Sequence, residues 1–524
     1  MHNTLNISTS PRAPLLGLDT DMEEAISPSP SPSPSPSLDD KDITAEHLSP
    51  FSSAQSRDLE GSSSSTSSPR YSKRRYLGLF QLALLNIIVS WSWLTFAPVS
   101  ETSADYFAVS VSAVNWLSTG FLFAFVVATP ATLYVLNKHG PKGAITVASV
   151  LVAIGSWVRY AGTRSAASYN SGNPNGRFGV VVLGQVLLGL AQPFVLSAPT
   201  RFSEQWFSPS ARIAATALTT LANPFGGALG QLIDPFWATN PQDIPNMVLW
   251  VSIISTVSCL PTLFLPSAPS SYSSSSSTIA LPLSPTGTAP KEPEHPPLTL
   301  RALRSLLRNP SLPLLAFPFS IYVAAFNATS SLLNPILQPF GFSETEAGIA
   351  GALLIVIGLV SSAITSPILD RRPKWRVPAI KALVPVIAVC YVLLIWAPTW
   401  GSVDGVGRVV GVYILLSILG GASFSLLPLA LEMLVDVSGA DVGAEVTSSL
   451  AWAAGQLGGG IFIVVMDALD TSTGMQRGVI FQAVIAVAAV PPVFALGLWG
   501  TGGGIGKRSE AGFGEMEERR EGVR

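Results

Sequence analysis

The chain contains a long series of separate apolar runs, each close to 20 residues, divided by shorter polar stretches. That length lets a helix cross roughly 30 Å of hydrocarbon, and a helix satisfies its own backbone within a single run. Of the 524 residues, 48% are hydrophobic and only 12% are charged, which is too little charge for a soluble surface of this size. We therefore predict an all-α polytopic membrane protein in a lipid bilayer, with twelve spans at about 77–99, 113–136, 143–163, 177–199, 211–233, 246–266, 312–335, 346–369, 377–398, 407–431, 445–467 and 478–500.

The polar stretches divide these spans into two sets of six. We predict an N-terminal six-helix half at 76–266 and a C-terminal half at 311–500. Residues 1–75 include a Ser-Pro repeat that cannot bury enough apolar surface to order itself, so they form a disordered cytoplasmic tail. The cytoplasmic linker 267–310 ends in leucines and arginines on opposite faces, which fits either a helix in the headgroup layer or the solvated start of span seven. Residues 501–524 form a second cytoplasmic tail.

Basic residues set the predicted orientation. Lys and Arg gather in alternate short loops, so the positive-inside rule places those loops and both termini in the cytoplasm. A basic turn follows span two at 136–142, and another follows span eight at 369–374. Two six-span halves with a basic turn at the same place is the layout of a major facilitator transporter, which binds its substrate between the halves. We assign gating at the cytoplasmic end to Lys138, Lys142, Arg201, Asp370, Arg371, Arg372 and Glu432, and expect Glu432 to pair with a basic turn.

Several other functions are disfavoured by composition. A net charge of -2 with scattered basic residues gives no face for nucleic acid. We find no Ser/His/Asp set, metal cluster or phosphate-cradling loop, so we predict no catalytic residue, no metal, no cofactor and no enzyme. The four histidines, His2, His47, His139 and His295, lie outside the predicted spans, which leaves haem iron without an obvious axial ligand in the pathway.

Uncharged polar residues within the spans are the informative ones, because each needs a partner or a wet cavity. Gln192, Asn223 and Gln456 lie roughly 13 to 16 Å from the cytoplasmic loops, near the bilayer centre. Two interpretations are open: hydrogen bonds between helices, or the lining of a substrate cavity. The matching depth of Gln192 and Gln456 in opposite halves favours the cavity for that pair.

Carboxylates are nearly absent from the predicted spans. Glu101 falls at the outer end of span one, and Asp234 falls beyond span five. Because a proton-coupled carrier needs an ionisable relay within the membrane, we favour a facilitator driven by the gradient of its substrate.

The sequence also resembles the feline leukaemia virus subgroup C receptor family, a branch of the major facilitator superfamily. The resemblance covers nearly all of residues 76 to 500. Its motifs are Asn115-Trp116-Leu117-Ser118, Gly155-Ser156-Trp157-Val158-Arg159, Leu183-Gly184-Gln185, Ala191-Gln192-Pro193-Phe194, Pro199-Thr200-Arg201, Trp206-Phe207, Leu332-Leu333-Asn334, Leu427-Pro428-Leu429 with Glu432, and Thr447-Ser448-Ser449 before Gln456.

This resemblance implies transport of choline or ethanolamine, with haem also associated with the family. Its choline site resembles an aromatic cage with glutamine amides, since ring faces attract a quaternary ammonium. By position, the cage tryptophan falls on Trp93 and the amides on Gln192 and Gln456. The second cage aromatic, a tyrosine, falls on Asn327, so the chain departs from the family there. Phe326, Tyr322 and Trp452 are the alternatives for the missing ring face.

Trp91 and Trp93 raise a separate question, because residues two apart on a helix point about 200° apart. The two rings therefore cannot face the same place, and because the resemblance implies that Trp93 lies in the cavity, a packing role is left for Trp91.

The leading hypothesis is a small-solute facilitator working by alternating access, for a small amine such as choline or ethanolamine or a related polar metabolite. The alternatives are a proton-coupled metabolite or drug exporter, a haem exporter, and a non-transporting nutrient receptor. We expect a monomer in the plasma membrane, with a vacuolar or lysosomal membrane as the alternative.

Overall fold

The computed structural model describes residues 74–164, 175–207, 209–265, 311–400, 406–438, 444–470 and 474–496. The linker predicted over 267–310 and the tail predicted over 501–524 lie outside the described residues, as does the N-terminal tail apart from Arg74 and Arg75. These three predictions therefore stay predictions.

Every element of the described chain is a helix. The first group comprises α1 (Arg74–Leu94), α2 (Ser100–Phe107), α3 (Val111–Arg164), α4 (Asn175–Trp206), α5 (Pro209–Trp237) and α6 (Ile244–Cys259), with 3-10 turns at Pro241–Asp243 and Leu260–Phe264. The second group comprises α9 (Ser311–Leu337), α10 (Glu344–Asp370), α11 (Arg376–Leu394), α12 (Val406–Ser438), α13 (Ala444–Ala468), α14 (Gln476–Ala488) and α15 (Val490–Phe494). Three further 3-10 turns lie at Gln338–Phe340, Pro373–Trp375 and Ala397–Thr399.

Ten helices of the described chain are long and apolar enough to cross a bilayer. One of them, α3, has 54 residues and is interrupted at Gly140, whose φ of 67° lies in the left-handed region that favours glycine. Pro141 follows directly, so α3 holds two spans joined at the predicted basic turn. Helix α5 is not among the ten, but its 29 residues pack against α1 and α10. With α3 taken as two segments and α5 added to the ten, the described helices match in number the twelve spans that the apolar runs predicted.

Two predicted spans end differently in the structure. Helix α1 stops at Leu94 instead of continuing to residue 99, and a turn through Pro98 leads into α2. The last span breaks after α14, where Pro491 and Pro492 open the short helix α15. Because proline has no N–H to donate, the helix ends at these two places while the apolar run continues.

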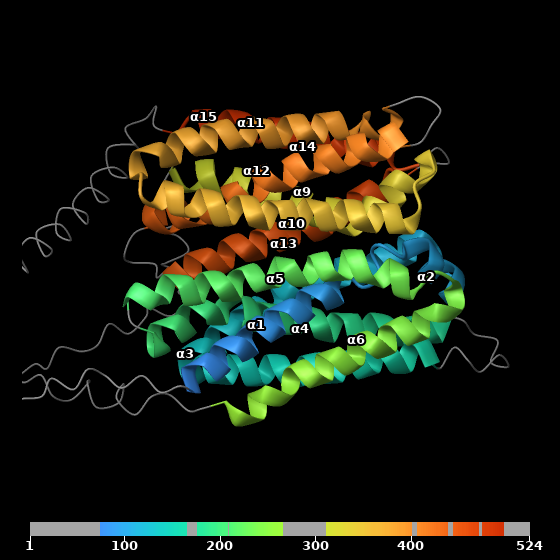
Figure 1. The fold of residues 1–524 in the computed structure, drawn as a ribbon, viewed down its shortest axis with the longest axis horizontal. Coiled ribbons are helices and arrows are strands. Elements are labelled where there is room, and N and C mark those ends of the chain that lie inside the picture. The colour runs from blue at the N-terminus through green and yellow to red at the C-terminus, as the bar shows by residue number, and fades with distance from the viewer. Residues whose placement is uncertain are drawn as a thin grey trace, which may run out of the picture. The chain divides into compact units, whose positions relative to one another are not determined.

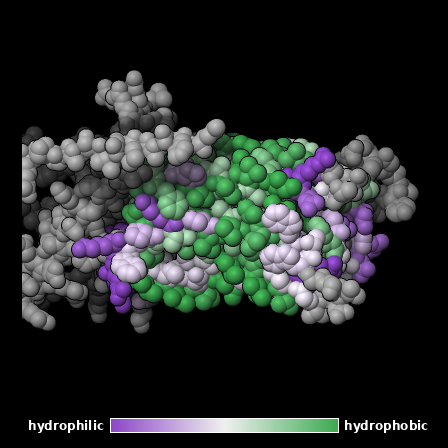
Figure 2. Space-filling model, turned by 90° about the horizontal axis from the view of Figure 1, so that it is seen from above, coloured by the Kyte–Doolittle hydropathy of each residue, from purple (hydrophilic) through white to green (hydrophobic). Residues whose placement is uncertain are grey.

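The helices form two groups that follow the chain order, with α1 to α6 in one and α9 to α15 in the other (Figure 1). The groups meet along two seams, α5 against α10 and α3 against α13. Figure 2 shows one face of the molecule, on which a hydrophobic band lies between hydrophilic patches at its two ends. This is the surface expected of a protein whose middle faces lipid and whose ends face water.

Glycine allows helices within each group to approach closely, as two examples show. A Cβ at Gly226 of α5 would lie 1.9 Å from the Ile87 carbonyl oxygen of α1. A Cβ at Gly420 of α12 would lie 1.8 Å from the Leu354 carbonyl oxygen of α10. Lipid gives helices no hydrophobic reason to associate, so such close backbone packing is a main source of their attraction.

We expect Gly226→Ala to lower the thermal unfolding temperature of the purified protein, because the new methyl meets backbone that cannot rotate away. Overpacking of this kind costs about 1 to 3 kcal/mol. Gly179→Ala is the matched control, since nothing lies within 4 Å of a Cβ there. Equal unfolding temperatures for the two variants would contradict this account of the α1–α5 contact.

Candidate functional site

Trp93 is buried at the end of α1, with its ring against the first span of α3. Its ring stacks on Phe121, with centroids 6.4 Å apart and planes 24° apart. The indole Nε1 has no hydrogen-bond partner within the described chain. Trp93 therefore combines an aromatic face with an unused donor, as a residue that meets a polar ligand requires.

Trp91 faces a different neighbour, as its spacing from Trp93 predicts. Its indole Nε1 donates to both carboxylate oxygens of Asp234 in α5, at 3.0 and 3.2 Å. Its ring stacks on Trp237, with centroids 5.8 Å apart. The contacts of Trp91 thus join α1 to α5 within the first group.

Asn327 of α9 and Gln456 of α13 bind each other. Asn327 Nδ2 donates to Gln456 Oε1 at 2.7 Å, and both side chains are buried. Asn327 Oδ1 and Gln456 Nε2 make no other hydrogen bond within the described chain. The second group therefore offers one acceptor and one donor, fixed relative to each other, at the position where the resemblance implies a ring.

Asn327 lies where α13 of the second group meets α3 of the first. A Cβ at Gly459 of α13 would lie 2.8 Å from Cβ of Asn327 and 3.2 Å from a methyl of Leu122, the neighbour of Phe121 in α3. Asn327 therefore lies beside the α3–α13 seam, next to Leu122, which directly follows Phe121 in α3.

Gln192 lies on the face of α4 that meets α3 near Phe121. It lies one turn beyond Gly189, where a Cβ would come within 2.8 Å of the Phe121 Cα. Its side chain is buried and its Oε1 has no partner within the described chain. A buried amide without a partner is costly unless a ligand or water completes it.

Asn223 has a different setting. Its Nδ2 donates to the Asn86 carbonyl at 3.3 Å, which joins α5 to α1 within the first group. For Asn223 this contact agrees with the first of the two interpretations, a hydrogen bond between helices.

The three alternatives for the missing ring face have other contacts. Tyr322 donates its hydroxyl to the Ala486 carbonyl of α14 at 2.9 Å. Phe326 packs edge-on against Phe424 of α12 at 5.2 Å, and Trp452 packs edge-on against Phe319 at 6.2 Å. Tyr322 is thereby committed to the packing of the second group, because rotating it would strand its hydroxyl.

One end of the bundle, which we call the α2 end, holds a hydrogen-bonded contact between the two groups. The Glu344 carboxylate of α10 accepts from the backbone N–H groups of Glu101 and Thr102, at 3.0 and 3.1 Å, and from the Thr102 hydroxyl at 2.6 Å. Asn334 donates to Glu344 and to Ser100. The open N–H groups at a helix start carry partial positive charge, so a carboxylate there is stabilising.

A second contact at this end joins α3 to α13, where Asp467 accepts from Ser112 and, at 2.8 Å, from Asn115.

Glu101 itself is an acid within this contact. Burial, followed by the nearby carboxylates of Glu344 and Asp105, raises its pKa above the ordinary value of 4.5. The resulting stabilisation is present below 4.5 and is lost as pH rises through the raised pKa. Protonation of Glu101 therefore favours the contact at the α2 end.

The predicted gating residues lie at the other end of the described bundle. Arg376 forms a 2.9 Å ion pair with Glu432, the pairing with a basic turn expected for Glu432. Arg201 donates to Asn137 at 2.7 Å, and Lys138 donates to Tyr134 at 3.0 Å. Lys142, Arg371 and Arg372 are exposed, whereas the side chain of Asp370 lies outside the described part. A role of these residues in gating stays a prediction.

The structure corrects the placement of Asp234 and shows a buried cation that the sequence analysis left unassigned. Asp234 was expected beyond span five, but it lies within α5 and is fully buried. Arg159 of α3 is also fully buried, and it attracts Asp234 electrostatically. A lone arginine inside an apolar run was the signal available for Arg159, because ionisable residues within spans are rare and usually functional. For Phe121 we find no such signal, since nothing in the sequence distinguishes it from the other aromatic residues of the same run.

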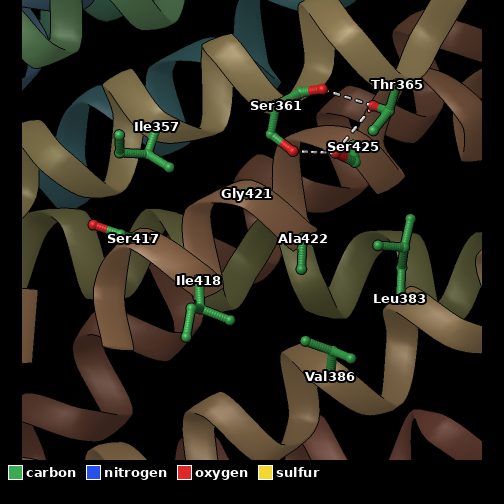
Figure 3. Close-up of a pocket in the computed structure, with 10 residues that line it drawn as sticks. All are labelled: Ile357, Ser361, Thr365, Leu383, Val386, Ser417, Ile418, Gly421, Ala422 and Ser425. Carbon is green, nitrogen blue, oxygen red and sulfur yellow. Dashed lines mark hydrogen bonds between the residues drawn. The ribbon is translucent and has the colours of Figure 1, made fainter. Parts of the chain in front are cut away.

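A pocket of about 400 Å³ lies elsewhere, in the second group between α10, α11 and α12 (Figure 3). Ile357, Val386 and Ile418 line it and are partly exposed on the outer surface of these helices. None of the predicted site residues lines it.

Comparison with known proteins agrees with this architecture. Residues 82–463 match the model of the Major Facilitator Superfamily. The chain belongs to this superfamily. Within this superfamily, the chain falls in the feline leukaemia virus subgroup C receptor branch, which its motifs resemble and to which its relatives belong.

Its relatives include solute carrier family 49 member A3 of Danio rerio, 30% identical over 405 residues, which cover 76% of this chain and 80% of the relative. The choline/ethanolamine transporter FLVCR1 of Felis catus is 27% identical over 425 residues, 79% of this chain and 71% of the relative. Human FLVCR2, also named a choline/ethanolamine transporter, is 24% identical over 424 residues, 79% of this chain and 76% of the relative.

Solved structures agree on the fold. A D-xylose-proton symporter superposes with a TM-score of 0.58 at 13% identity, over 80% of this chain and 98% of the symporter. A bacterial homologue of the human lysosomal transporter Spinster gives 0.59 at 12% identity, over 80% and 96%. The relatives and neighbours of this major facilitator are transporters and not enzymes, and the predicted multi-pass fold is confirmed.

We expect Glu344→Gln to loosen the α2 end, because a neutral amide accepts more weakly from the start of α2 than a carboxylate does. The readout is maleimide labelling of Ser103→Cys, a buried position on α2, in the purified protein. Labelling should become about tenfold faster, the size expected for weakening hydrogen bonds to a charged group.

Glu346→Gln is the matched control for this experiment. The Glu346 carboxylate accepts from Ser343 at the start of its own helix and makes no hydrogen bond to α2 within the described chain. If both variants label at the wild-type rate, Glu344 does not hold the two groups together.

Proposed function

We propose that this major facilitator is a facilitator for a small amine of the choline and ethanolamine class. The amine would bind between the two groups, at Trp93 and Gln192 on one side and Asn327 and Gln456 on the other. Relatives named choline/ethanolamine transporters support the substrate class. The stacked Trp93–Phe121 pair supports it independently, because aromatic faces attract ammonium cations.

One observation refines this proposal: the hydrogen-bonded Asn327–Gln456 pair stands where the resemblance implies a tyrosine ring. A quaternary ammonium has no N–H to donate, so an amide oxygen there contributes little to binding it. A primary ammonium has three N–H donors, and the ethanolamine hydroxyl can both donate and accept. We infer that primary amines are preferred over quaternary ones.

Asn223 is the weakest member of the predicted site. Its contact with the Asn86 carbonyl supports a packing role between α1 and α5. We therefore place the binding role on Trp93, Gln192, Asn327 and Gln456, and expect Asn223 to act on the packing of α1.

Alternating access would open and close the two ends in turn. The Glu344 and Asp467 contacts support a state in which the α2 end is closed. We further infer that the basic end, with Lys138, Arg201 and Arg376, is cytoplasmic, as the positive-inside rule predicts. Both termini would then be cytoplasmic and the protein would act as a monomer in the plasma membrane.

The test is uptake of labelled ethanolamine and choline into cells that lack their own carriers. We expect wild type to favour ethanolamine, and Asn327→Tyr to shift the preference toward choline by about 2- to 30-fold, the range for one added ring face near a desolvated cation. Trp93→Ala should weaken both. Trp250→Ala, at a tryptophan that is 54% exposed on α6, is the matched control and should transport normally.

Two outcomes would reject the assignment. Transport of neither amine by the wild type removes the substrate class. Unchanged uptake by Trp93→Ala removes Trp93 from the site.

A proton-coupled carrier is the second candidate, because Asp234 supplies a buried carboxylate that the sequence placed outside the spans. Such a carrier would lose uptake when the proton gradient is dissipated, and Asp234→Asn would make its uptake independent of pH. For the facilitator, uptake should follow the amine gradient alone and survive a protonophore.

A further inference from the structure

The end of α1 poses a problem that the membrane makes acute. A helix leaves its last four carbonyls without intrahelical partners, and lipid supplies none. In α1 these carbonyls belong to Trp91, Ser92, Trp93 and Leu94. Since Pro98 has no N–H, the chain that follows cannot satisfy them all by continuing the helix.

The structure shows a partner for each of these four carbonyls. The Thr95 hydroxyl donates to Trp91 O at 3.0 Å, and the Ala97 N–H donates to Leu94 O at 3.2 Å. The two middle carbonyls, those of Ser92 and Trp93, are reached only by side chains of other helices within the described chain.

Those side chains are Arg159 of α3 and Gln185 of α4. Arg159 Nη1 donates to Ser92 O at 3.0 Å and to Gln185 Oε1 at 3.1 Å. Gln185 Nε2 donates to Ser92 O at 3.0 Å and to Trp93 O at 3.3 Å. The bond between Arg159 and Gln185 fixes the amide so that its N–H groups, and not its oxygen, face the carbonyls.

Charge supports the same arrangement. A helix end carries partial negative charge, so a guanidinium there is favourable, and more so where water is excluded. The Phe96 ring lies 5.6 Å from the same guanidinium. The buried charge is balanced by Asp234, which holds Trp91 from the α5 side. The last turn of α1 is thus bound from two sides by groups of opposite charge.

We propose that Arg159 and Gln185 are positioning residues, which cap the last turn of α1 and thereby hold Trp93 at the substrate site. This inference rests on the proposed function for the role of Trp93. The backbone of Trp93 is bound through its own carbonyl, and its ring rests on Phe121. Without the cap, the last turn is free to fray, and the ring loses its fixed place against the site.

Two variants test the cap without leaving an unbalanced buried charge. Gln185→Met removes both bonds to the carbonyls at similar side-chain volume. The double variant Arg159→Met with Asp234→Asn removes both charges, while the asparagine oxygen still accepts from Trp91. Arg159→Met alone is unsuitable, because the unpaired Asp234 could prevent folding.

Gln81→Met is the matched control. Gln81 is a buried amide on the same helix and bonds the Ser258 carbonyl at 3.0 Å and the Thr262 hydroxyl at 2.6 Å. It lies twelve residues from Trp93, roughly 18 Å along the helix. It therefore loses the same kind of hydrogen bonds at the opposite end of α1.

The first readout is hydrogen–deuterium exchange of residues 93–97 in the purified full chain. We expect faster exchange there in both test variants and wild-type exchange in Gln81→Met. The second readout is ethanolamine uptake, where KM should rise about tenfold, the size expected for losing hydrogen bonds to a charged group, with little change in maximal rate.

Exchange at the wild-type rate in both test variants overturns the cap. Faster exchange with an unchanged KM overturns its link to Trp93. If the wild type transports neither ethanolamine nor choline, the proposed function fails, and the exchange measurement still decides whether the cap exists.

Discussion

The bilayer offers no hydrogen bonds, and the rest of this structure depends on that constraint. Every backbone carbonyl and N–H within the hydrocarbon must find a partner inside the protein. Uninterrupted helices meet the requirement by themselves. Where a helix breaks, as α1 does at Leu94, other groups must complete it, and for the Ser92 and Trp93 carbonyls Arg159 and Gln185 do so here. The break leaves polar backbone and Trp93 buried in the protein, and a buried guanidinium stabilises that backbone.

Packing in lipid depends on shape more than on hydrophobicity, and the two groups solve this alike. Gly226 brings α5 against α1, and Gly420 brings α12 against α10, with backbone near backbone in each case. The seams between the groups combine both kinds of contact, since a Cβ at Gly348 of α10 would lie 2.4 Å from the Gln231 carbonyl oxygen of α5, and polar contacts are found at the α2 end. Glu344 binds the start of α2, and Asp467 binds the start of α3. The hydrogen bonds at the α2 end can be exchanged for bonds to water, which suits two groups that move relative to each other.

The candidate site is asymmetric in its chemistry. One side supplies rings, Trp93 on Phe121, and the other supplies amides, Asn327 on Gln456. Rings attract a cation without directing it, whereas an amide pair selects the group that can hydrogen-bond. An asymmetric site of this kind would distinguish amines by their number of N–H donors more than by their charge.

The sequence by itself determined the fold. Run length, basic turns and the repeated layout fixed twelve spans in two groups, because crossing a bilayer is a local requirement that each run meets alone. It also predicted that Trp91 and Trp93 face apart, since helical geometry is local. It could not place Asp234 inside α5, because hydropathy locates the end of a span only to within a few residues and Asp234 lies directly after the predicted end.

Tertiary structure alone decided the partners. Asn327 meets Gln456 across 129 positions of sequence, and Trp91 meets Asp234 across 143. An amide or an indole in an apolar run indicates only that its side chain needs a hydrogen-bond partner. Which helix supplies that partner depends on how the bundle packs, and that packing is a property of all the helices together.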